Sequence, residues 1–253
     1  MIGLSSMYAA LFDKTIESFI GDVKMNLHDL GAAEVFDFKT TMLNEKTVAF
    51  LKEIKDVKFT VHGPFDVASR ISDPSDDSRK LAIKTIKSSI DYAADIGALA
   101  YVQHPGYKTY SSDKNLWPLN CESLVDIIDY GNSRGIKVAI ENMTPDKAFM
   151  SAPSEFEEFS KTNNIDLNIV FDTGHANIAN KIDEFIEKYA SKFLIIHVTD
   201  NAGDKDLHLN VGAGNIDWMK LVKPLRQNFT GTYVIESAWE PLKSLTKLKA
   251  VLG

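Results

Sequence analysis

Short apolar runs alternate along the chain with longer segments in which apolar residues recur at helical spacing. The short runs are rich in β-branched and aromatic residues, which is typical of strands that are covered on both faces. Eight runs are predicted to be strands, over residues 2–6, 33–38, 58–62, 98–103, 137–141, 167–172, 193–197 and 232–236. Helices are predicted over residues 77–95, 119–133, 154–162, 182–191, 218–228 and 242–252.

This order of elements predicts βα units with a parallel sheet, and eight strands match the count of a closed barrel. The fold class is therefore predicted to be α/β, with a single (β/α)8 TIM barrel domain spanning residues 1–253. A prior of about 150 residues per domain would permit two domains, but no Pro/Gly/Ser-rich linker interrupts the pattern. An open doubly wound sheet is the alternative, although no Gly-rich turn for a dinucleotide follows the first strand.

The composition is that of a soluble globular protein, with 44% apolar and 25% charged residues. No apolar run approaches the roughly 20 residues that a membrane helix needs. The amino terminus has no visible secretion signal, so a cytoplasmic protein is expected. Cys121 is the single cysteine, and a metal site would therefore need His, Asp and Glu ligands.

The formal net charge of −7 argues against nonspecific binding of nucleic acid, because Lys and Arg hold a phosphate backbone. Only four of the 28 basic residues are arginines. Arg70 and Lys108 follow predicted strands and are the clearest candidates to meet a phosphate, although solvated charges are the plainer interpretation. A membrane partner is not expected. Nucleic acid is disfavoured but stays open, and so does assembly into a homo-oligomer.

Five of the six histidines lie at or just beyond the carboxyl end of a predicted strand: His62, His104, His175, His197 and His208. The sixth, His28, is expected on the surface. In a barrel the carboxyl ends of all strands meet on one face. The five side chains are therefore expected to converge, although they span nearly 150 residues of sequence.

Acidic residues follow the same pattern. Glu141, Asp172 and Glu236 each close a predicted strand, and Asp206 precedes His208 by two residues, so both point to one side of an extended segment. A carboxylate at the end of an apolar strand is costly unless a partner or a metal compensates its charge. For any one residue, an ion pair or a helix cap is an equal interpretation. For the set, a divalent cation is the simplest compensation.

Several motifs occur in a characteristic order: His104-Pro105-Gly106, Glu141-Asn142-Met143, Asp172-Thr173-Gly174-His175, His197-Val198-Thr199-Asp200-Asn201, Asp206-Leu207-His208 and Glu236. In this order they resemble the xylose isomerase-like TIM barrel superfamily, in particular its sugar phosphate isomerase/epimerase branch. The same fold houses endonuclease IV, the apurinic-site nuclease. The resemblance covers nearly the whole chain and is more specific for fold and metal site than for substrate.

The resemblance to the isomerases and epimerases implies one divalent ion, Mn, Mg, Co or Zn, with four ligands: Glu141, Asp172, His197 and Glu236. By the same likeness Glu141 and Glu236 would form the acid/base pair that moves a proton on and off the carbon beside a carbonyl. The substrate would be a sugar or a sugar phosphate.

The resemblance to endonuclease IV implies further ligands and up to three zinc ions. The additional ligands would be His62 and His104 for one ion, and His175, Asp206 and His208 for another, with Glu141 as a bridge. This keeps a phosphodiester hydrolase, or another metal-dependent hydrolase or lyase, open as the alternative. The acidic charge and the few arginines favour the isomerase branch, and a noncatalytic binding barrel is a third interpretation. Ala213 stands where both groups frequently have Glu.

Four residues are predicted to contact substrate: His62, His175, Glu34 and Trp239. By the resemblance, His175 would bind a substrate hydroxyl. Glu34 is expected to point into the barrel, toward substrate or a lysine. Trp239 lies just beyond Glu236, although large aromatic residues more often fill the core or its rim. Four further residues follow strand ends and are candidates for the pocket wall: Tyr8, Phe65, Tyr107 and Met143.

Overall fold

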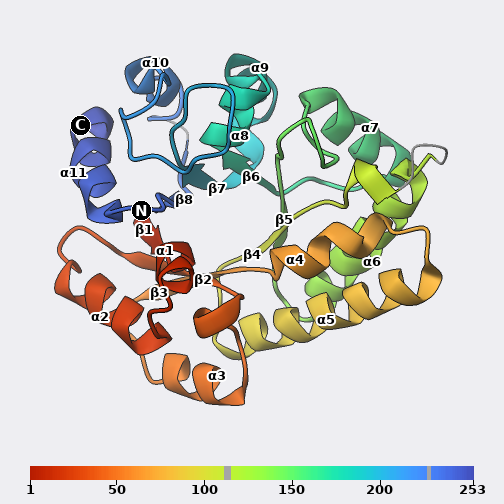
Figure 1. Cartoon of the computed structure of the whole chain (residues 1–253), viewed down its shortest axis with the longest axis horizontal. Coiled ribbons are helices and arrows are strands. Elements are labelled where there is room, and N and C mark those ends of the chain that lie inside the picture. Colours follow the sequence, from red (N-terminus) through yellow and green to blue (C-terminus); the bar gives the residue numbers. More distant parts are fainter. Residues whose placement is uncertain (111–114, 227–228) are drawn as a thin grey trace.

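Eight parallel strands close into a barrel in the computed structural model, which describes residues 1–110, 115–226 and 229–253 (Figure 1). The strands are β1 (Ile2–Ser5), β2 (Ala32–Phe36), β3 (Lys58–His62), β4 (Tyr101–Gln103), β5 (Val138–Glu141), β6 (Ile169–Asp172), β7 (Phe193–Val198) and β8 (Thr232–Ile235). Each strand pairs with the next, and β1 pairs with β8 through Gly3 and Val234, which closes the ring. The predicted (β/α)8 barrel is confirmed.

Helices surround the barrel on its outside (Figure 1). They are α1 (Met7–Leu11), α2 (Ile16–Met25), α3 (Glu45–Lys52), α4 (Phe65–Ala68), α5 (Asp76–Asp95), α6 (Trp117–Ser133), α7 (Pro153–Asn163), α8 (Thr173–Ile178), α9 (Ile182–Tyr189), α10 (Trp218–Val222) and α11 (Pro241–Leu252). Short 3₁₀ turns are η1 (Lys39–Thr41), η2 (Ser69–Ser72), η3 (Lys108–Tyr110) and η4 (Ala190–Lys192). Over the described ranges, no helix is long and apolar enough to cross a membrane.

Two helix boundaries differ from the predicted ones for local reasons. α10 ends at Val222, before Pro224, which has no backbone N–H to continue the helix. The predicted helix ran to Asn228, which lies outside the described residues. α7 begins at Pro153, and Ala152 is the residue before its first turn. The Ala152 N–H has no partner within the helix, and Glu155 Oε2 accepts it at 3.1 Å, which stabilises this start.

Five helices occupy segments without a predicted helix: α1, α2, α3, α4 and α8. The longest of them, α2, does carry a start signal, because the Thr15 side chain accepts the N–H of Ser18 at 3.3 Å. It also buries Phe19, Ile20 and Val23 against the barrel, at the spacing of one helix face.

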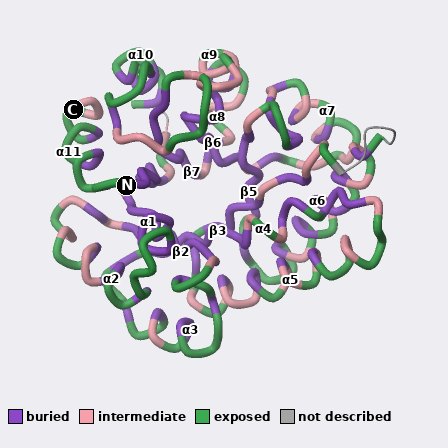
Figure 2. The backbone as a smooth tube through the Cα atoms, viewed as in Figure 1, coloured by how far each residue is buried: buried purple, intermediate pink, exposed green. Residues whose placement is uncertain are grey.

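Side-chain alternation along the strands places the polar groups above an apolar layer. The barrel interior contains a buried cluster of six residues: Ala100, Val102, Ala139, Val170, Ile195 and Val234. Five of the six lie two positions before a predicted ligand; Ile195, for example, precedes His197, and Val234 precedes Glu236. Because side chains two apart share a face, the ligands form the next layer toward the carboxyl ends. Figure 2 shows the buried strands inside the more exposed helices.

Candidate metal centre

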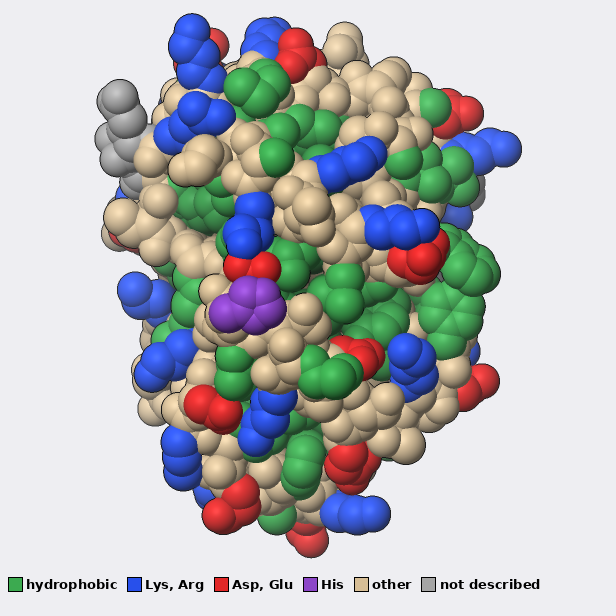
Figure 3. All heavy atoms as spheres, turned by 90° about the vertical axis from the view of Figure 1, so that its left-hand side faces the viewer, with side chains coloured by type: hydrophobic (Ala, Val, Ile, Leu, Met, Phe, Trp, Pro, Cys, Tyr) green, Lys and Arg blue, Asp and Glu red, His purple; other side chains and the backbone are tan. Residues whose placement is uncertain are grey.

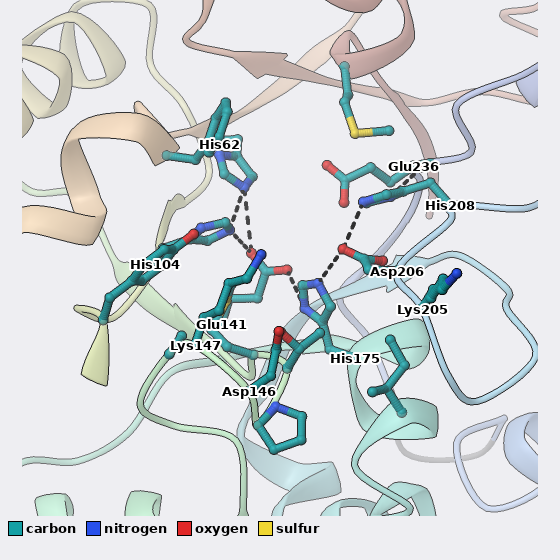
Figure 4. Close-up of a pocket in the computed structure, with 18 of the residues that line it drawn as sticks. His62, His104, Glu141, Asp146, Lys147, His175, Lys205, Asp206, His208 and Glu236 are labelled. Atoms are coloured by element: carbon teal, nitrogen blue, oxygen red, sulfur yellow. Dashed lines mark hydrogen bonds and ion pairs between the residues drawn. The ribbon is translucent and has the colours of Figure 1, made fainter. Parts of the chain in front are cut away.

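A cavity of about 630 Å³ opens at the carboxyl ends of the strands. Figure 4 shows ligand-type side chains pointing into it from different parts of the chain. Those that line it are His62, His104, Glu141, His175, Asp206, His208 and Glu236. Asp172 and His197 are fully buried beside Glu141. All nine predicted ligands therefore gather around one cavity, whereas His28 is exposed, as expected.

Four of these residues each place one ligand atom within 4.8 Å of the other three: Glu141, Asp172, His197 and Glu236. All four side chains are buried. Asp172 Oδ2 has no hydrogen-bond partner among the described residues. Buried carboxylate oxygens without partners are costly unless a cation compensates them. This set of three carboxylates and one imidazole therefore fits a divalent metal ion.

Asp172 serves two purposes with its two oxygens. Oδ1 accepts the backbone N–H of His175 at 2.6 Å and so caps α8. Oδ2 faces the ligand group and stays without a hydrogen-bond partner among the described residues. The side chain of Asn142 fixes this strand end, because it donates to the Asp172 carbonyl at 3.0 Å and accepts the Asp172 N–H at 2.7 Å. A helix cap and a metal ligand are thus compatible at this position.

His197 is held between carboxylates. Its Nδ1 lies 3.2 Å from Glu141 Oε1 and 3.3 Å from Glu236 Oε2. Its Nε2 lies 3.1 Å from Glu34 Oε1, and Thr60 Oγ1 donates to the other Glu34 oxygen at 3.0 Å. Glu34 does point into the barrel, as expected, but it is fully buried and does not line the cavity. The expected contact of Glu34 with substrate is therefore replaced by a contact that orients His197.

His62 and His104 form a second group with Glu141. Glu141 Oε2 lies 3.0 Å from His104 Nε2 and 3.5 Å from His62 Nε2, and the two Nε2 atoms are 3.1 Å apart. His62 Nδ1 lies 2.8 Å from the Gly63 carbonyl, which selects the tautomer with a proton on Nδ1. His62 Nε2 then has a lone pair for a metal. These three residues could hold a second cation.

His175, Asp206 and His208 form a third group. Asp206 Oδ2 lies 3.1 Å from His175 Nε2 and 3.3 Å from His208 Nε2. The Nδ1 atoms of the two histidines face the backbone carbonyls of Asn142 and Glu236, at 2.8 and 3.0 Å. A carbonyl that accepts the proton on Nδ1 leaves the lone pair of Nε2 available to bind a metal ion.

The charges of the site shift its pKa values strongly. Burial raises the pKa of Asp172 to about 7; His175 opposes the shift, and Glu141 adds to it. Burial alone would lower the pKa of His197, but Glu236 and Glu34 outweigh it and hold that pKa well above its usual value. Burial keeps the pKa of His104 below its usual value. A site with such opposed shifts is typical of metal binding or acid/base chemistry.

Asp200 organises the loop that carries Asp206 and His208. Its buried carboxylate accepts the N–H of Gly212 at 2.8 Å and the Trp218 indole N–H at 2.9 Å. Its backbone exchanges two hydrogen bonds with Leu209. The two ends of the loop are therefore tied to one carboxylate directly after β7. Asp200 belongs to the sequence motif His197-Val198-Thr199-Asp200-Asn201, but only its fully buried position reveals this role.

Several other candidates lie elsewhere than predicted. Trp239 does not line the cavity; its indole is 63% exposed and packs on Phe12, with ring centroids 4.6 Å apart. Tyr8 is also absent from the wall, because its hydroxyl donates to Asp22 at 2.6 Å inside the helical layer. Phe65, Tyr107 and Met143 do line the cavity.

The phosphate candidates are both engaged in ion pairs outside the cavity wall. Arg70 pairs with Asp73 at 3.7 Å and Lys108 pairs with Glu155 at 3.3 Å. Two lysines that sequence reasoning missed, Lys147 and Lys205, line the cavity instead (Figure 4). They lie in the loops after β5 and β7, and each follows an aspartate that also lines it.

An apolar wall faces the ligand groups. It includes Met7, Leu11, Phe36, Phe38 and Phe65, which come from α1, from the end of β2 and from α4. Of these, Phe65 alone was among the predicted candidates. Phe36 stacks on Phe65 with ring centroids 5.7 Å apart. The cavity therefore has one charged side and one apolar side, so it can accept a ligand with both kinds of surface.

The closed barrel, with metal-type side chains at the carboxyl ends of its strands, is consistent with a known protein family. The sequence matches the family model described as xylose isomerase-like TIM barrel over residues 16–251, and the chain belongs to this family. Among curated relatives, the uncharacterized protein MJ1311 of Methanocaldococcus jannaschii is 29% identical over 90% of this chain and 81% of its own length. A probable endonuclease 4 of Bacillus velezensis is 26% identical over 66% of this chain and 61% of its own length.

Solved structures of sugar epimerases share the fold. A D-tagatose 3-epimerase-like protein superposes with a TM-score of 0.89 and is 29% identical, over 99% of this chain and 96% of that chain. An L-ribulose 3-epimerase superposes with a TM-score of 0.76 over 98% of this chain and 86% of that chain; at 16% identity this likeness concerns the fold alone.

Proposed function

We propose that this chain is a divalent-metal-dependent epimerase or isomerase of a small ketose. One observation carries the proposal: Glu141 and Glu236 both line the cavity, and each places an oxygen within 3.3 Å of His197 Nδ1. Two carboxylates thus approach one point from different strands. The similarity to a D-tagatose 3-epimerase-like protein at 29% identity supports the same class of reaction.

The proposed metal ligands are Glu141, Asp172, His197 and Glu236. A bound Mn, Zn, Mg or Co ion would polarise the sugar oxygens beside the transferred proton. Glu141 and Glu236 act as the acid/base pair: one takes the proton from the carbon beside the carbonyl, and the other returns a proton to it. His175 and His62, at the cavity wall, bind sugar hydroxyls.

An uncharged sugar suits this cavity better than a sugar phosphate. Five carboxylates line it, from Glu141, Asp146, Asp204, Asp206 and Glu236, against the two lysines, 147 and 205. A phosphate there would face these carboxylates, whereas the hydroxyls of an uncharged sugar can donate hydrogen bonds to them. The apolar wall supplies a surface for the C–H groups of a sugar.

Proton exchange in heavy water tests the proposed reaction. Chain loaded with Mn²⁺, Co²⁺, Zn²⁺ or Mg²⁺ is incubated in D2O with D-fructose, D-tagatose and D-ribulose and with their phosphates. Deuterium at the carbon beside the carbonyl, together with the epimer or isomer, is followed by NMR. We expect exchange with at least one free ketose and weaker exchange with its phosphate. No exchange with any sugar under any metal would contradict the proposed function.

A second candidate function is an endonuclease 4-like phosphodiesterase. The gathering of all three ligand groups around one cavity favours it, because clustered cations activate water and stabilise a leaving oxygen. Cleavage of a DNA duplex that contains one abasic site tests this function. Metal analysis gives the number of ions bound per chain. About three ions per chain with cleavage would support the nuclease, whereas one ion and no cleavage would support the epimerase.

A further inference from the structure

Two aromatic side chains stand exposed beside the mouth of the cavity. Trp239 is 63% exposed and Phe12 is 43% exposed, and their rings lie 4.6 Å apart at an angle of 59°. They come from opposite ends of the chain, one after β8 and the other after α1. Exposed hydrophobic side chains are visible on the face that carries the chain termini (Figure 3). Adjoining exposed aromatic rings of this kind often mark a binding surface.

This pair, which we call the aromatic shelf, continues the apolar wall of the cavity. Leu11, the neighbour of Phe12, lines the cavity. Ala238, the neighbour of Trp239, belongs to a buried cluster with Met7, Ala10 and Phe36, two of which also line the cavity. The Ala238 N–H donates to the carbonyl of His208, a cavity residue, at 2.9 Å. Phe12 therefore lies one residue beyond the cavity wall, and Trp239 follows a residue that packs against that wall.

The residue that follows each ring has an unfavourable backbone angle. Asp13 follows Phe12 with φ of 52°, and Glu240 follows Trp239 with φ of 44°. Residues other than glycine rarely adopt such angles, and where they do the strain often serves a binding site. Pro241 then starts α11 and fixes the chain directly after Glu240.

We infer that the aromatic shelf binds a second ring carried by the ketose, at the end of the sugar remote from the metal centre. This inference rests on the proposed function. The metal ligands lie at the inner end of the cavity, so the reacting carbons lie inward and a substituent on the last carbon lies toward the mouth. The preferred substrate class is then a ketose that carries a glycosyl group on its terminal oxygen. The C–H face of that ring stacks on Trp239, and the apolar wall contacts the chain between the two ends.

The test compares D-fructose with isomaltulose, which is fructose with a glucosyl group on O6. Exchange of the proton at C1 or C3 in D2O gives kcat/KM for both sugars with metal-loaded enzyme. We expect wild type to prefer isomaltulose, and Trp239→Ala to lower kcat/KM for isomaltulose about three- to tenfold, the range of one aromatic contact. The value for D-fructose is expected to stay unchanged. Met219→Ala, which removes a 57% exposed side chain on α10, is the matched control and should change neither value.

A binding measurement separates this inference from the proposed reaction. Trp218 is buried and Trp117 is half-buried, so Trp239 is the most exposed of the three indoles. Isomaltulose is expected to change the tryptophan emission more than D-fructose does, and the difference should vanish in Trp239→Phe.

Three outcomes would overturn the inference: equal kcat/KM for the two sugars in wild type, equal losses for both sugars in Trp239→Ala, or a change of oligomeric state in that variant with the preference kept. The last outcome would assign the shelf to contact between copies of the chain. If neither sugar exchanges its proton but the emission still responds through Trp239, the proposed reaction fails and the subsite stands.

Discussion

Glu34 Oε1 lies 3.1 Å from Nε2 of His197, on the side of the ring opposite to the atom that faces Glu141 and Glu236. The two atoms are not aligned as a hydrogen bond, so their contact is chiefly electrostatic. A carboxylate behind a ligating imidazole fixes the direction of the ring and increases its basicity. We therefore expect Glu34 to act through His197 on a metal ion bound at this site.

Glu34→Gln is expected to weaken metal binding about tenfold or more, because the amide keeps the shape but loses the charge behind His197. Competition with a chromophoric chelator measures the affinity. Glu184→Gln removes a carboxylate on the outer helix α9 and provides a control of equal charge change. An unchanged affinity in Glu34→Gln would show that the contact has no role in metal binding.

Glu141→Gln and Glu236→Gln are each expected to lower the rate of epimerisation about 10²- to 10⁴-fold, since an amide cannot accept the proton. If one carboxylate serves each epimer, each variant should still exchange the proton of one epimer with D2O without converting it. NMR of both epimers in separate incubations checks this. Wild-type conversion in both variants would remove these residues from the acid/base role.

The inner layer of the site follows from the sequence because alternation along a strand is a local rule. Val170 and Asp172 are two residues apart, as are Ile195 and His197, so each pair points to the same side of its strand. An apolar run that ends in a polar residue therefore predicts an interior side chain of the barrel and a candidate metal ligand in the next layer. The closed barrel itself follows from the number of such runs.

The partners of these residues depend on contacts that local patterns do not encode. Glu34 and His197 are far apart in sequence, and only closure of the barrel brings them together. Trp239 lies three residues after Glu236, yet its indole packs on Phe12 outside the cavity. Lys147 lies in a loop whose course depends on the bridge between Tyr107 and Ala148. Such features require the three-dimensional structure.

Removal of metal is expected to lower the melting temperature. Three buried carboxylates then face one another without a compensating cation, and a ligand at 100 times its Kd contributes about 2.7 kcal/mol. For a chain of this size the shift is roughly 5–10 °C. Calorimetry with chelator and with added Mn²⁺ or Zn²⁺ measures it, and Asp172→Asn should reduce the response. The same melting temperature in all conditions would argue against the site.

Asp37→Asn is expected to raise the free energy of unfolding above that of wild type, and by more at alkaline than at acidic pH. Burial raises the pKa of Asp37, although hydrogen bonds from Ser89 and from the Leu43 N–H oppose the shift. The folded state therefore holds this proton more tightly than the unfolded chain, so the contribution to stability is lost as pH rises from about 4 through the raised pKa. An asparagine can keep both contacts without a charge. Urea unfolding of both proteins in chelator across this pH range measures the difference between their free energies of unfolding. This difference should grow with pH, and a constant difference would contradict the prediction.

Gly214→Ala is expected to disturb the loop between β7 and α10 while the barrel stays folded. A Cβ at this position would lie 2.1 Å from the carbonyl oxygen of Asn201 and 2.3 Å from Asp200 Oδ1, and a backbone carbonyl cannot yield as the end of a flexible side chain can. The cost is about 1–3 kcal/mol, as for an overpacked core position.

The displaced loop carries Asp206 and His208, so this variant tests how much the third ligand group matters. Gly21→Ala is the matched control: it lies within α2 with no atom within 4 Å of the new Cβ, and should stabilise the chain by about 0.5–1 kcal/mol. An epimerase that uses only the four inner ligands should keep its metal affinity in Gly214→Ala and lose mainly substrate affinity, because Asp206 and His208 line the cavity. An enzyme that needs the third group for its chemistry should instead bind fewer ions and lose kcat, since these two side chains would no longer meet His175.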